Sequence, residues 1–280
     1  MWECHASIRV DHVQALVSDM DADHAYTPCE MFFPDVAPGC YDPLTGRWRK
    51  PASTAEERVY QTVQHERILK YFNTRDGYLE LAFHPDGDLW TYLLDHRPPL
   101  GTRIEWAVEI AEGLAHLHSH SIVWADAHFR NVLVTQDHHI VLCDFAFSLS
   151  KPGPCHQFTT APPPIFLAPW GYYGRPATHV DIFGFGVMLF ALLANRFPWT
   201  TDLLPDADAQ SEAAGKHGRR QFDTMDDPYL GTHFGGILEK CFAVSYATGT
   251  ELLDDMKRVL KTWCSTTHQA MSLAKVCHLT

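Results

Sequence analysis

The sequence predicts an α+β fold that combines short strand hairpins with long buried helices. Residues 132–134 and 140–142 are short β-branched runs on either side of a turn-like segment, a pattern that predicts a hairpin. Apolar residues recur at helical intervals over 104–120. The uncharged run 182–194 is typical of a helix buried on all sides.

Composition is that of a globular chain. The 280 residues are 46% hydrophobic, which suffices for one substantial core or two adjoining ones. The formal charge of −12 and the scattering of the 22 Lys and Arg residues argue against a nucleic-acid surface, because phosphate binding favours a basic patch. The run 182–194 is shorter than the roughly twenty apolar residues of a membrane span. We therefore expect no nucleic-acid partner and no membrane insertion.

Cysteine and histidine usage indicates reduced thiols and no metal site built from histidines. The eight cysteines include no Cys-x-x-Cys pair, and no apolar signal sequence opens the chain, so free thiols in the cytoplasm or nucleus are expected. His116, His118 and His120 are two residues apart, which places neighbours on opposite faces of a helix. We expect no metal site from these histidines.

The first third of the chain carries weaker signals. Residues 1–30 are expected to be a poorly ordered extension, and 40–50 can form a hairpin around the turn residues Asp42, Pro43 and Gly46. Residues 53–56 resemble a capping box that opens a helix over 56–70.

In the last third of the chain, 202–220 is rich in Asp, Ala and Gly and is expected to be a mobile surface loop.

The strongest chemical signal is the set Asp126, Asn131 and Asp144. Asn131 directly precedes the first run of the predicted hairpin, and Asp144 follows the second after one residue, so the hairpin should bring them into one small cleft. Carboxylate and amide oxygens are hard ligands that suit magnesium. The set is therefore suited to holding a hard metal ion such as magnesium.

These residues resemble the protein kinase pattern His-Arg-Asp-x-x-x-x-Asn followed by Asp-Phe-Gly. The resemblance implies that Asp126 accepts the proton of the substrate hydroxyl, while Asn131 and Asp144 hold magnesium that bridges the phosphates of ATP. It also implies a two-lobed, protein-kinase-like fold, with a small, mostly β N-lobe that contains one helix and a larger, mainly helical C-lobe.

Segments in kinase order extend the resemblance from about Glu80 to Leu260. Residues 80–93 resemble the hinge and the helix after it, with Leu79 as gatekeeper, Glu80 and Ala82 at the cofactor and Asp88 at the ribose. Residues 104–120 resemble the helix before the catalytic loop, and 165–170 the end of the activation segment. Residues 181–193 resemble the central helix, whose first residue, Asp181, would bind the catalytic-loop backbone.

The implied domain runs over 31–268 and is followed by a tail, 269–280. Its N-lobe would cover about 31–83, the hinge about 80–88 and the C-lobe about 89–268.

The chain departs from the kinase pattern at several positions. Trp124 and Ala125 replace the His and Arg of the catalytic loop. Without that Arg, activation by loop phosphorylation is not expected. Ala146 replaces the Gly after Asp-Phe, which should reduce flipping of this segment. Trp170 replaces the Glu of Ala-Pro-Glu, and its usual Arg partner is also missing, so we expect an apolar contact at Trp170.

The N-lobe match is thin. No Gly-x-Gly-x-x-Gly loop is present. Lys50 and Glu56 are the nearest candidates for the Lys that contacts the phosphates and its Glu partner, but their spacing is short. Arg47 and Arg49 are alternatives to Lys50, and capping is an alternative use of Glu56.

Three functional hypotheses follow. The first is a divergent kinase that uses ATP and magnesium to phosphorylate a protein. The second is a pseudokinase that binds nucleotide or a partner protein without phosphate transfer. A small-molecule kinase on the same fold is a third, weaker reading.

The catalytic-loop segment 126–131 does not distinguish Ser or Thr from Tyr as the residue that accepts the phosphate. Arg130 before Asn131 resembles tyrosine kinases, but a surface ion pair would explain it equally well. His128 stands where serine/threonine kinases usually carry Lys, so neutralisation of the substrate phosphate should weaken as pH rises.

Overall fold

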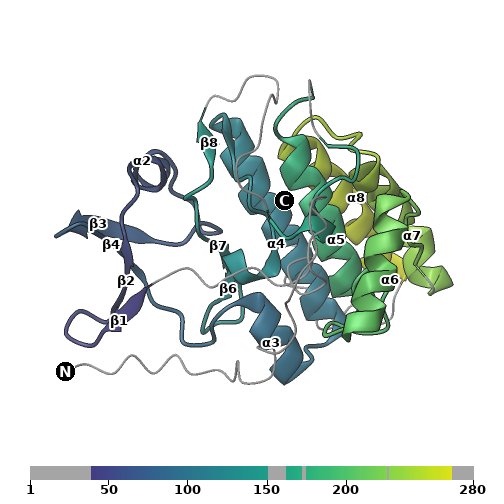
Figure 1. The fold of residues 1–280 in the computed structure, drawn as a ribbon, viewed down its shortest axis with the longest axis horizontal. Coiled ribbons are helices and arrows are strands. Elements are labelled where there is room, and N and C mark those ends of the chain that lie inside the picture. Colours follow the sequence, from purple (N-terminus) through teal and green to yellow (C-terminus); the bar gives the residue numbers. More distant parts are fainter. Residues whose placement is uncertain (1–38, 151–161, 172–174, 226, 267–280) are drawn as a thin grey trace, which may run out of the picture.

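A computed structural model describes residues 39–150, 162–171, 175–225 and 227–266. The expected extension 1–30 and tail 269–280 lie outside the described residues. Figure 1 shows a small sheet with one helix on one side and a larger group of helices on the other. The predicted division into a mostly β N-lobe and a mainly helical C-lobe is confirmed.

The N-lobe sheet is antiparallel, with the strand order β1-β2-β4-β3. Its strands are β1 (Cys40–Asp42), β2 (Arg47–Pro51), β3 (Tyr71–Arg75) and β4 (Tyr78–Ala82). The predicted hairpin over 40–50 is confirmed, since β1 pairs with β2. Asp42 Oδ1 accepts a hydrogen bond from the Leu44 N–H in the turn, and Gly46 adopts a φ of +66° that glycine tolerates without strain.

Helix α2 (Thr54–Thr62) begins as predicted but ends early. Ser53 caps it by accepting the N–H of Glu56 at 3.1 Å. The expected helix over 56–70 is wrong beyond Thr62, because Leu69 N–H donates to the Leu142 carbonyl at 2.9 Å in extended pairing. The buried residues Val63 and Ile68 fit either conformation, so apolar spacing did not reveal where the helix stops.

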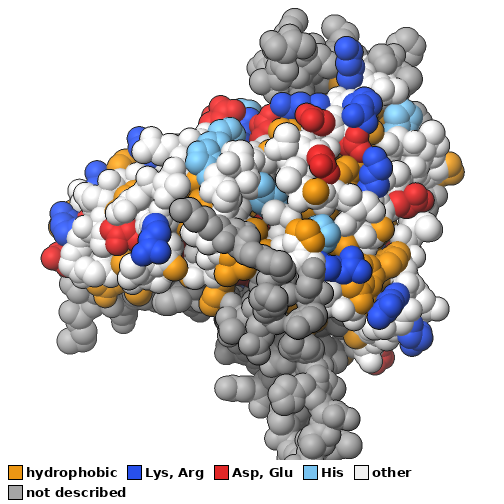
Figure 2. Space-filling view, turned by 90° about the horizontal axis from the view of Figure 1, so that it is seen from above, with side chains coloured by type: hydrophobic (Ala, Val, Ile, Leu, Met, Phe, Trp, Pro, Cys, Tyr) orange, Lys and Arg blue, Asp and Glu red, His pale blue; other side chains and the backbone are white. Residues whose placement is uncertain are grey.

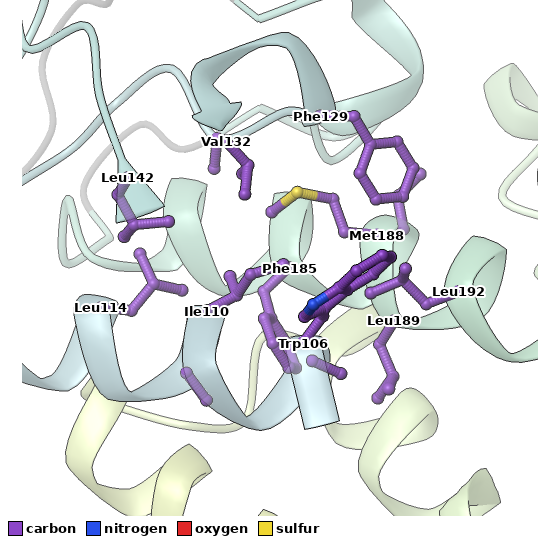
Figure 3. Packing of buried hydrophobic residues seen from close by; sticks show 14 of the residues in the cluster. Trp106, Ile110, Leu114, Phe129, Val132, Leu142, Phe185, Met188, Leu189 and Leu192 are labelled. Atoms are coloured by element: carbon purple, nitrogen blue, oxygen red, sulfur yellow. The ribbon is translucent and has the colours of Figure 1, made fainter. Parts of the chain in front are cut away.

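The C-lobe is built on long helices. Their bounds are α3 (Leu89–His96), α4 (Leu100–Ser119), α5 (His179–Ala194), α6 (Ala207–Gly218), α7 (Pro228–Phe242) and α8 (Gly249–Thr266). Both predicted helices, over 104–120 and 182–194, are confirmed. In Figure 3 side chains of α4, including Trp106, Ile110 and Leu114, meet Phe185 and other side chains of α5 in the buried core.

Helix α6 corrects the expectation of a loop over 202–220. Asp206 caps it by accepting the N–H of Ala209, and Ala213 and His217 are buried on its inner face. His217 Nε2 donates to the Leu167 carbonyl at 2.8 Å. The alternation of small and charged residues resembles a loop because the buried face of α6 is narrow and weakly apolar.

Two pairs of short strands lie next to the acidic residues in the sequence. The pair β6 (Val132–Val134) and β7 (Ile140–Leu142) confirms the predicted hairpin. A 3-10 turn, η1 (Phe129–Asn131), leads into β6, and η2 (Pro164–Phe166) precedes α5. Strands β5 (Ile122–Val123) and β8 (Leu149–Ser150) flank this region. In the described part of the chain, no helix has both the length and the apolar character to cross a membrane.

Candidate functional site

A cleft of about 250 Å³ lies where β2, β4, η1 and the β6–β7 hairpin meet. Lys50, Glu56, Asn131 and Asp144 all line it. The rest of its wall comprises Trp48, Tyr60, Leu69, Leu81, Ala82, Phe83, His84, Gly87, Asp88, Arg130, Leu133 and Cys143. A larger cavity of about 900 Å³ shares some of these residues but includes none of the four charged or amide groups named first.

Lys50 is held between two carboxylates. Its Nζ lies 3.1 Å from Glu56 Oε1 and 2.6 Å from Asp144 Oδ1. Burial opposes the charge of Lys50, but attraction by Asp144 and Glu56 outweighs it and raises the Lys50 pKa. Burial also raises the pKa of Glu56, and the Lys50 charge only partly offsets this. The Glu56 side chain therefore faces Lys50, while its backbone N–H takes part in the helix cap.

The two alternatives to Lys50 lie elsewhere. Arg47 pairs with Glu80 at 2.5 Å, and the Arg49 guanidinium stacks over the ring of Tyr78. Side chains of a strand alternate between its two faces, so Trp48 and Lys50 point to the cleft while Arg47 and Arg49 point away. Neither arginine lines the cleft.

Glu80 does not lie in the cleft, contrary to expectation. It is fully buried on the far side of β4, where Arg47 and Arg75 pair with its carboxylate at 2.5 Å and 2.8 Å. Leu81, not Leu79, lines the cleft. The expected gatekeeper Leu79 therefore does not line the cleft, although it pairs with Lys50 across the sheet and shares a strand face with Leu81.

Ala82 and Asp88 do line the cleft, as the sequence suggested. Ala82 is the last residue of β4. The Asp88 carboxylate caps α3 by accepting the N–H of Thr91 at 3.0 Å and its hydroxyl at 2.9 Å. Asp88 therefore caps α3 and also lines the cleft.

Asp126 and Asn131 form a second polar group. Asn131 Nδ2 donates to Asp126 Oδ2 at 2.9 Å, and His128 Nε2 lies 3.2 Å from Asp126 Oδ1. Asn131 Nδ2 also donates to the Asp126 carbonyl at 3.1 Å. Within the described residues no group donates to Asn131 Oδ1, so this oxygen is free for a ligand.

Trp124 positions the backbone beneath Asp144. Its buried Nε1–H donates to the carbonyls of Cys143, at 3.0 Å, and Asp144, at 3.2 Å. Cys143 N–H in turn donates to the Asn131 carbonyl at 2.9 Å. Asp144 has a φ of 55°, a left-handed conformation that costs a non-glycine residue energy and persists only where its surroundings hold it.

Asp181 holds the other side of this loop. Its carboxylate accepts the N–H groups of Trp124 and Ala125, each at 2.8 Å. The contact implied by the sequence resemblance is therefore present. Ala125 has a φ of 65°, so Asp181 also secures a strained backbone. His118 completes the arrangement with Nε2 at 2.9 Å from Asp181 Oδ2.

The remaining departures are accommodated by packing. Trp170 meets the rings of Phe183 and Phe222 edge to face, with centroids 6.1 Å and 5.6 Å away, so the expected apolar contact is confirmed. Ala146 does not have a positive φ, and alanine therefore fits there. Across the described residues no cluster of three or more His, Cys, Asp or Glu side chains has metal-site geometry.

Sequence reasoning missed Trp48, Leu81, Phe83 and Leu133 in the cleft wall. Trp48 is two residues before Lys50 and therefore shares its strand face. With Lys50 as a candidate, this spacing predicts that Trp48 also faces the cleft. The connection 83–88 has no repeating pattern, so only its path in the structure reveals that Phe83 borders the cleft.

As a whole, the cleft brings a buried lysine, two carboxylates and a free amide oxygen together. A cation of this kind can neutralise an anionic ligand, while Asn131 Oδ1 and the Asp144 oxygens suit a hard divalent metal. Asp126 nearby can accept a proton or orient a hydroxyl. The arrangement therefore suits phosphate chemistry.

Comparison with known proteins points the same way. A family model described as a protein kinase domain matches residues 45–256. The cAMP-dependent protein kinase catalytic subunit PRKX of Homo sapiens is 28% identical over 250 residues, which cover 86% of this chain and 63% of PRKX. The serine/threonine-protein kinase PLK4 of Drosophila persimilis is 29% identical over 172 residues, which cover 57% of this chain but only 21% of PLK4.

Proposed function

This chain belongs to the protein kinase family, and we propose that it transfers the γ-phosphate of ATP to a protein hydroxyl with the help of magnesium. The observation that carries the proposal is the contact of Lys50 with both Glu56 and Asp144, in the same cleft as Asn131. Phosphoryl transfer depends mainly on positioning and charge neutralisation. A cleft with these groups meets that need.

In this proposal Lys50 neutralises phosphate charge, and Glu56 keeps its Nζ in place. Asn131 Oδ1 and the Asp144 carboxylate would hold magnesium, for which oxygen ligands are preferred. Magnesium and ATP, when bound, supply the phosphoryl group and neutralise its charge. Ala82 would border the nucleotide through its backbone, and Asp88 would face the ribose. The Glu80 side chain does not line this cleft and pairs with Arg47 and Arg75 instead.

Asp126 would orient the acceptor hydroxyl and take up its proton. Its carboxylate is restrained by Asn131 Nδ2 at 2.9 Å and His128 Nε2 at 3.2 Å. These contacts fix the carboxylate near the proposed metal ligand Asn131. Proton acceptance by a positioned carboxylate is the general-base role expected of this residue in the family.

A second candidate function rests on Trp48. The indole lines the cleft and lies nearly parallel to the ring of Phe83, with centroids 6.3 Å apart. The cleft volume of about 250 Å³ is below the ~300–1,000 Å³ typical of ligand pockets. This favours the alternative of a pseudokinase that binds a protein partner and admits nucleotide poorly.

Thermal unfolding with and without millimolar magnesium and ATP tests these alternatives, because a ligand of the native state raises Tm. Phosphate transfer from labelled ATP to a mixture of generic protein substrates is measured in parallel. The variants are Asp144→Ala and Asp126→Asn, and the exposed Asp254→Asn serves as control.

The kinase proposal predicts a magnesium-dependent rise in Tm that Asp144→Ala loses. It also predicts phosphate transfer that Asp126→Asn reduces by at least about a hundredfold, whereas Asp254→Asn leaves both unchanged. If the unmodified chain shows no Tm shift and no phosphate transfer, the result would instead support partner binding.

A further inference from the structure

The outer face of the N-lobe sheet, which is the face turned away from the cleft, carries a group of cations and aromatic rings. Side chains alternate along a strand, and directly paired residues of antiparallel strands lie on the same face. Arg49 pairs with Glu80, and Arg47 is two residues before Arg49. Tyr78, two residues before Glu80, pairs with Arg75. All five side chains therefore point to the outer face.

Arg49 and Lys70 have no carboxylate within ion-pair distance in the described part of the chain. The Arg49 guanidinium lies 4.8 Å from the ring centre of Tyr78, and its buried Nε makes no hydrogen bond. Lys70 Nζ lies 5.0 Å from the ring centre of Phe72, and the Arg47 guanidinium lies over the same ring at 4.1 Å. Such contacts attract a cation to a ring but leave its charge unneutralised.

The acids on this side of the sheet are already engaged. Glu80 is fully buried and serves two guanidinium groups, since Arg47 and Arg75 lie 2.5 Å and 2.8 Å from its oxygens. Asp76 reaches Arg75 only at 4.0 Å, and Asp42 is held by hydrogen bonds within its own turn. Figure 2 shows Lys and Arg side chains among Asp and Glu side chains on the face seen from above. The outer face of the sheet differs in presenting cations without a carboxylate of their own.

The same face exposes aromatic surface. Phe72 and Tyr78 are 38% and 39% exposed, although a cation lies over each ring. Guanidinium and ammonium groups bind carboxylates through charge-assisted hydrogen bonds, and the rings between them offer apolar contact. The outer face therefore suits a polypeptide segment that combines acidic with aromatic side chains.

The chain itself contains a segment of that composition. Residues 11–35, which lie outside the described residues, include six Asp or Glu and no Lys or Arg. They also include one Tyr and two Phe. The carboxylates of this segment are complementary to Arg49 and Lys70, and its rings are complementary to the exposed aromatic surface.

The length of the chain permits this contact within one molecule. Gly39 precedes the edge strand β1 and lies against the indole of Trp48, on the cleft side of the sheet. The segment must therefore pass around β1 to reach the outer face. Sixteen residue steps separate Asp23 from Gly39, which span about 50 Å when extended. Four strands about 5 Å apart span only about 15 Å, so the reach is sufficient.

We propose that the acidic segment 11–35 docks on the outer face of the N-lobe sheet of its own chain, with carboxylates on Arg49 and Lys70. Tethering favours this segment over a separate acidic protein, because the linker keeps it at a high effective concentration. The inference does not depend on phosphate transfer. It concerns the cleft nonetheless, since β2 presents Arg49 on the docking face and Lys50 on the opposite face. Docking would steady the strand that positions Lys50.

Zero-length coupling with a water-soluble carbodiimide tests the inference on the full chain, because it joins a lysine amine to a carboxylate that is in direct contact. Coupled peptides from the monomer are identified by mass spectrometry at low and at high salt. Lys70 is the probe on the docking face, and the exposed Lys261 of α8 is the control lysine. A mixture of isotope-labelled and unlabelled chains separates contacts within one molecule from contacts between two.

Two variants accompany the unmodified chain. Arg49→Glu reverses a charge on the docking face and leaves the coupling lysine in place. Arg58→Glu makes the same charge change at an exposed position of α2 and is the matched control. The salt series needs no substitution, so it tests the docking even if Arg49→Glu does not fold.

Lys70 is expected to couple to carboxylates of residues 11–35 of the same molecule, whereas Lys261 is not. Raising the salt concentration from about 50 mM to about 500 mM should lower the coupled fraction of Lys70 at least about threefold, because exposed charge contacts are screened. Arg49→Glu should lower it by a similar factor at low salt. Arg58→Glu should leave it unchanged.

Three outcomes would overturn the inference. Coupling between labelled and unlabelled chains would assign the segment to a second copy of the protein. Equal coupling of the segment to Lys70 and Lys261 would show that it does not select the outer face. If Lys70 couples to no residue of 1–38, the outer face is left for another acidic partner. Each of these results leaves the proposed kinase function untouched.

Discussion

At the scale of single residues, Glu56 links the pH of the solution to the position of Lys50. Burial raises the pKa of Glu56 above its ordinary 4.5, so this carboxylate takes up a proton at a higher pH in the folded chain than in the unfolded one. The folded state gains stability from that proton as pH falls. Lys50, however, loses the charge of one partner.

The first prediction is a loss of activity on mild acidification. We expect kcat/KM to fall as pH is lowered through the raised pKa of Glu56, before the pH reaches 4.5. The Lys50 pKa is raised above 10.5, so Lys50 produces no alkaline loss near neutrality.

Rate profiles from about pH 5 to 8 for the unmodified chain and Glu56→Gln test this prediction. Glu56→Gln should be slower at neutral pH and lack this acidic fall. An unchanged profile in the variant would show that another group causes it.

Trp124 is the second residue whose role is local. It replaces a histidine of the family pattern, yet its indole N–H bonds to the carbonyls of Cys143 and Asp144. Unlike imidazole, indole does not titrate in the physiological range and always donates. The support of Asp144 is therefore independent of the protonation of this residue.

The second prediction concerns Trp124→Phe, which keeps an aromatic ring but removes the donor. Leaving these buried carbonyls without the N–H should lower the free energy of unfolding by about 1–3 kcal/mol. Because the Asp144 backbone is less restrained, the magnesium-dependent rise in Tm with ATP should also shrink. Urea unfolding measures the free energy of unfolding. If Trp124→Phe keeps the whole magnesium-dependent rise in Tm with ATP, Asp144 does not need the indole N–H.

At the scale of secondary structure elements, α6 shows how a weak pattern can conceal a packed helix. Its inner face consists of Gln210, Ala213 and His217, which are buried, while Ser211 and Glu212 are exposed. Burial lowers the pKa of His217, which therefore stays neutral and donates to the Leu167 carbonyl. This contact connects α6 to the segment before α5.

The third prediction separates a packed helix from a surface loop. Ala213→Asp places a charge in the core and should lower the free energy of unfolding by at least about 2 kcal/mol. The control Ser211→Asp adds the same charge at an exposed position and should change it by less than about 0.5 kcal/mol. Equal, small effects of both changes in urea unfolding would mean that α6 does not pack as described.

At the scale of the whole molecule, the lobe architecture depends on close approach of α8 to α4. Gly249 begins α8 and donates its N–H to His118 Nδ1 at 2.7 Å. A Cβ at this position would lie 2.7 Å from the backbone of Leu114 and Ala115. The glycine therefore allows the helices to pack around His118, which in turn contacts Asp181.

The fourth prediction follows from that contact. Gly249→Ala should lower the free energy of unfolding by about 1–3 kcal/mol through overpacking. Gly236→Ala is the control, because no atom lies within 4 Å of its Cβ position. Alanine should be neutral there or add up to about 1 kcal/mol of helix stability. Chemical denaturation of both variants measures the difference, and a neutral Gly249→Ala would contradict the close packing.

Local patterns in the sequence determined the elements whose signal lies within a few residues. The hairpin around Asp42 and Gly46, the cap at Ser53 and the helix over 104–120 follow from turn chemistry, capping and apolar spacing. The β6–β7 hairpin likewise brought Asn131 near Asp144. Each of these signals acts between neighbours in the chain.

Only the tertiary structure decided what depends on contacts between distant segments. Lys50 meets Asp144 across 94 residues, and no local pattern selects it over Arg47 or Arg49. The face of Glu80 depends on strand register, and the end of α2 on pairing with Leu142. Burial and electrostatics act through space, whereas propensity and periodicity act along the chain. The cleft therefore becomes specific only when the lobes are packed together.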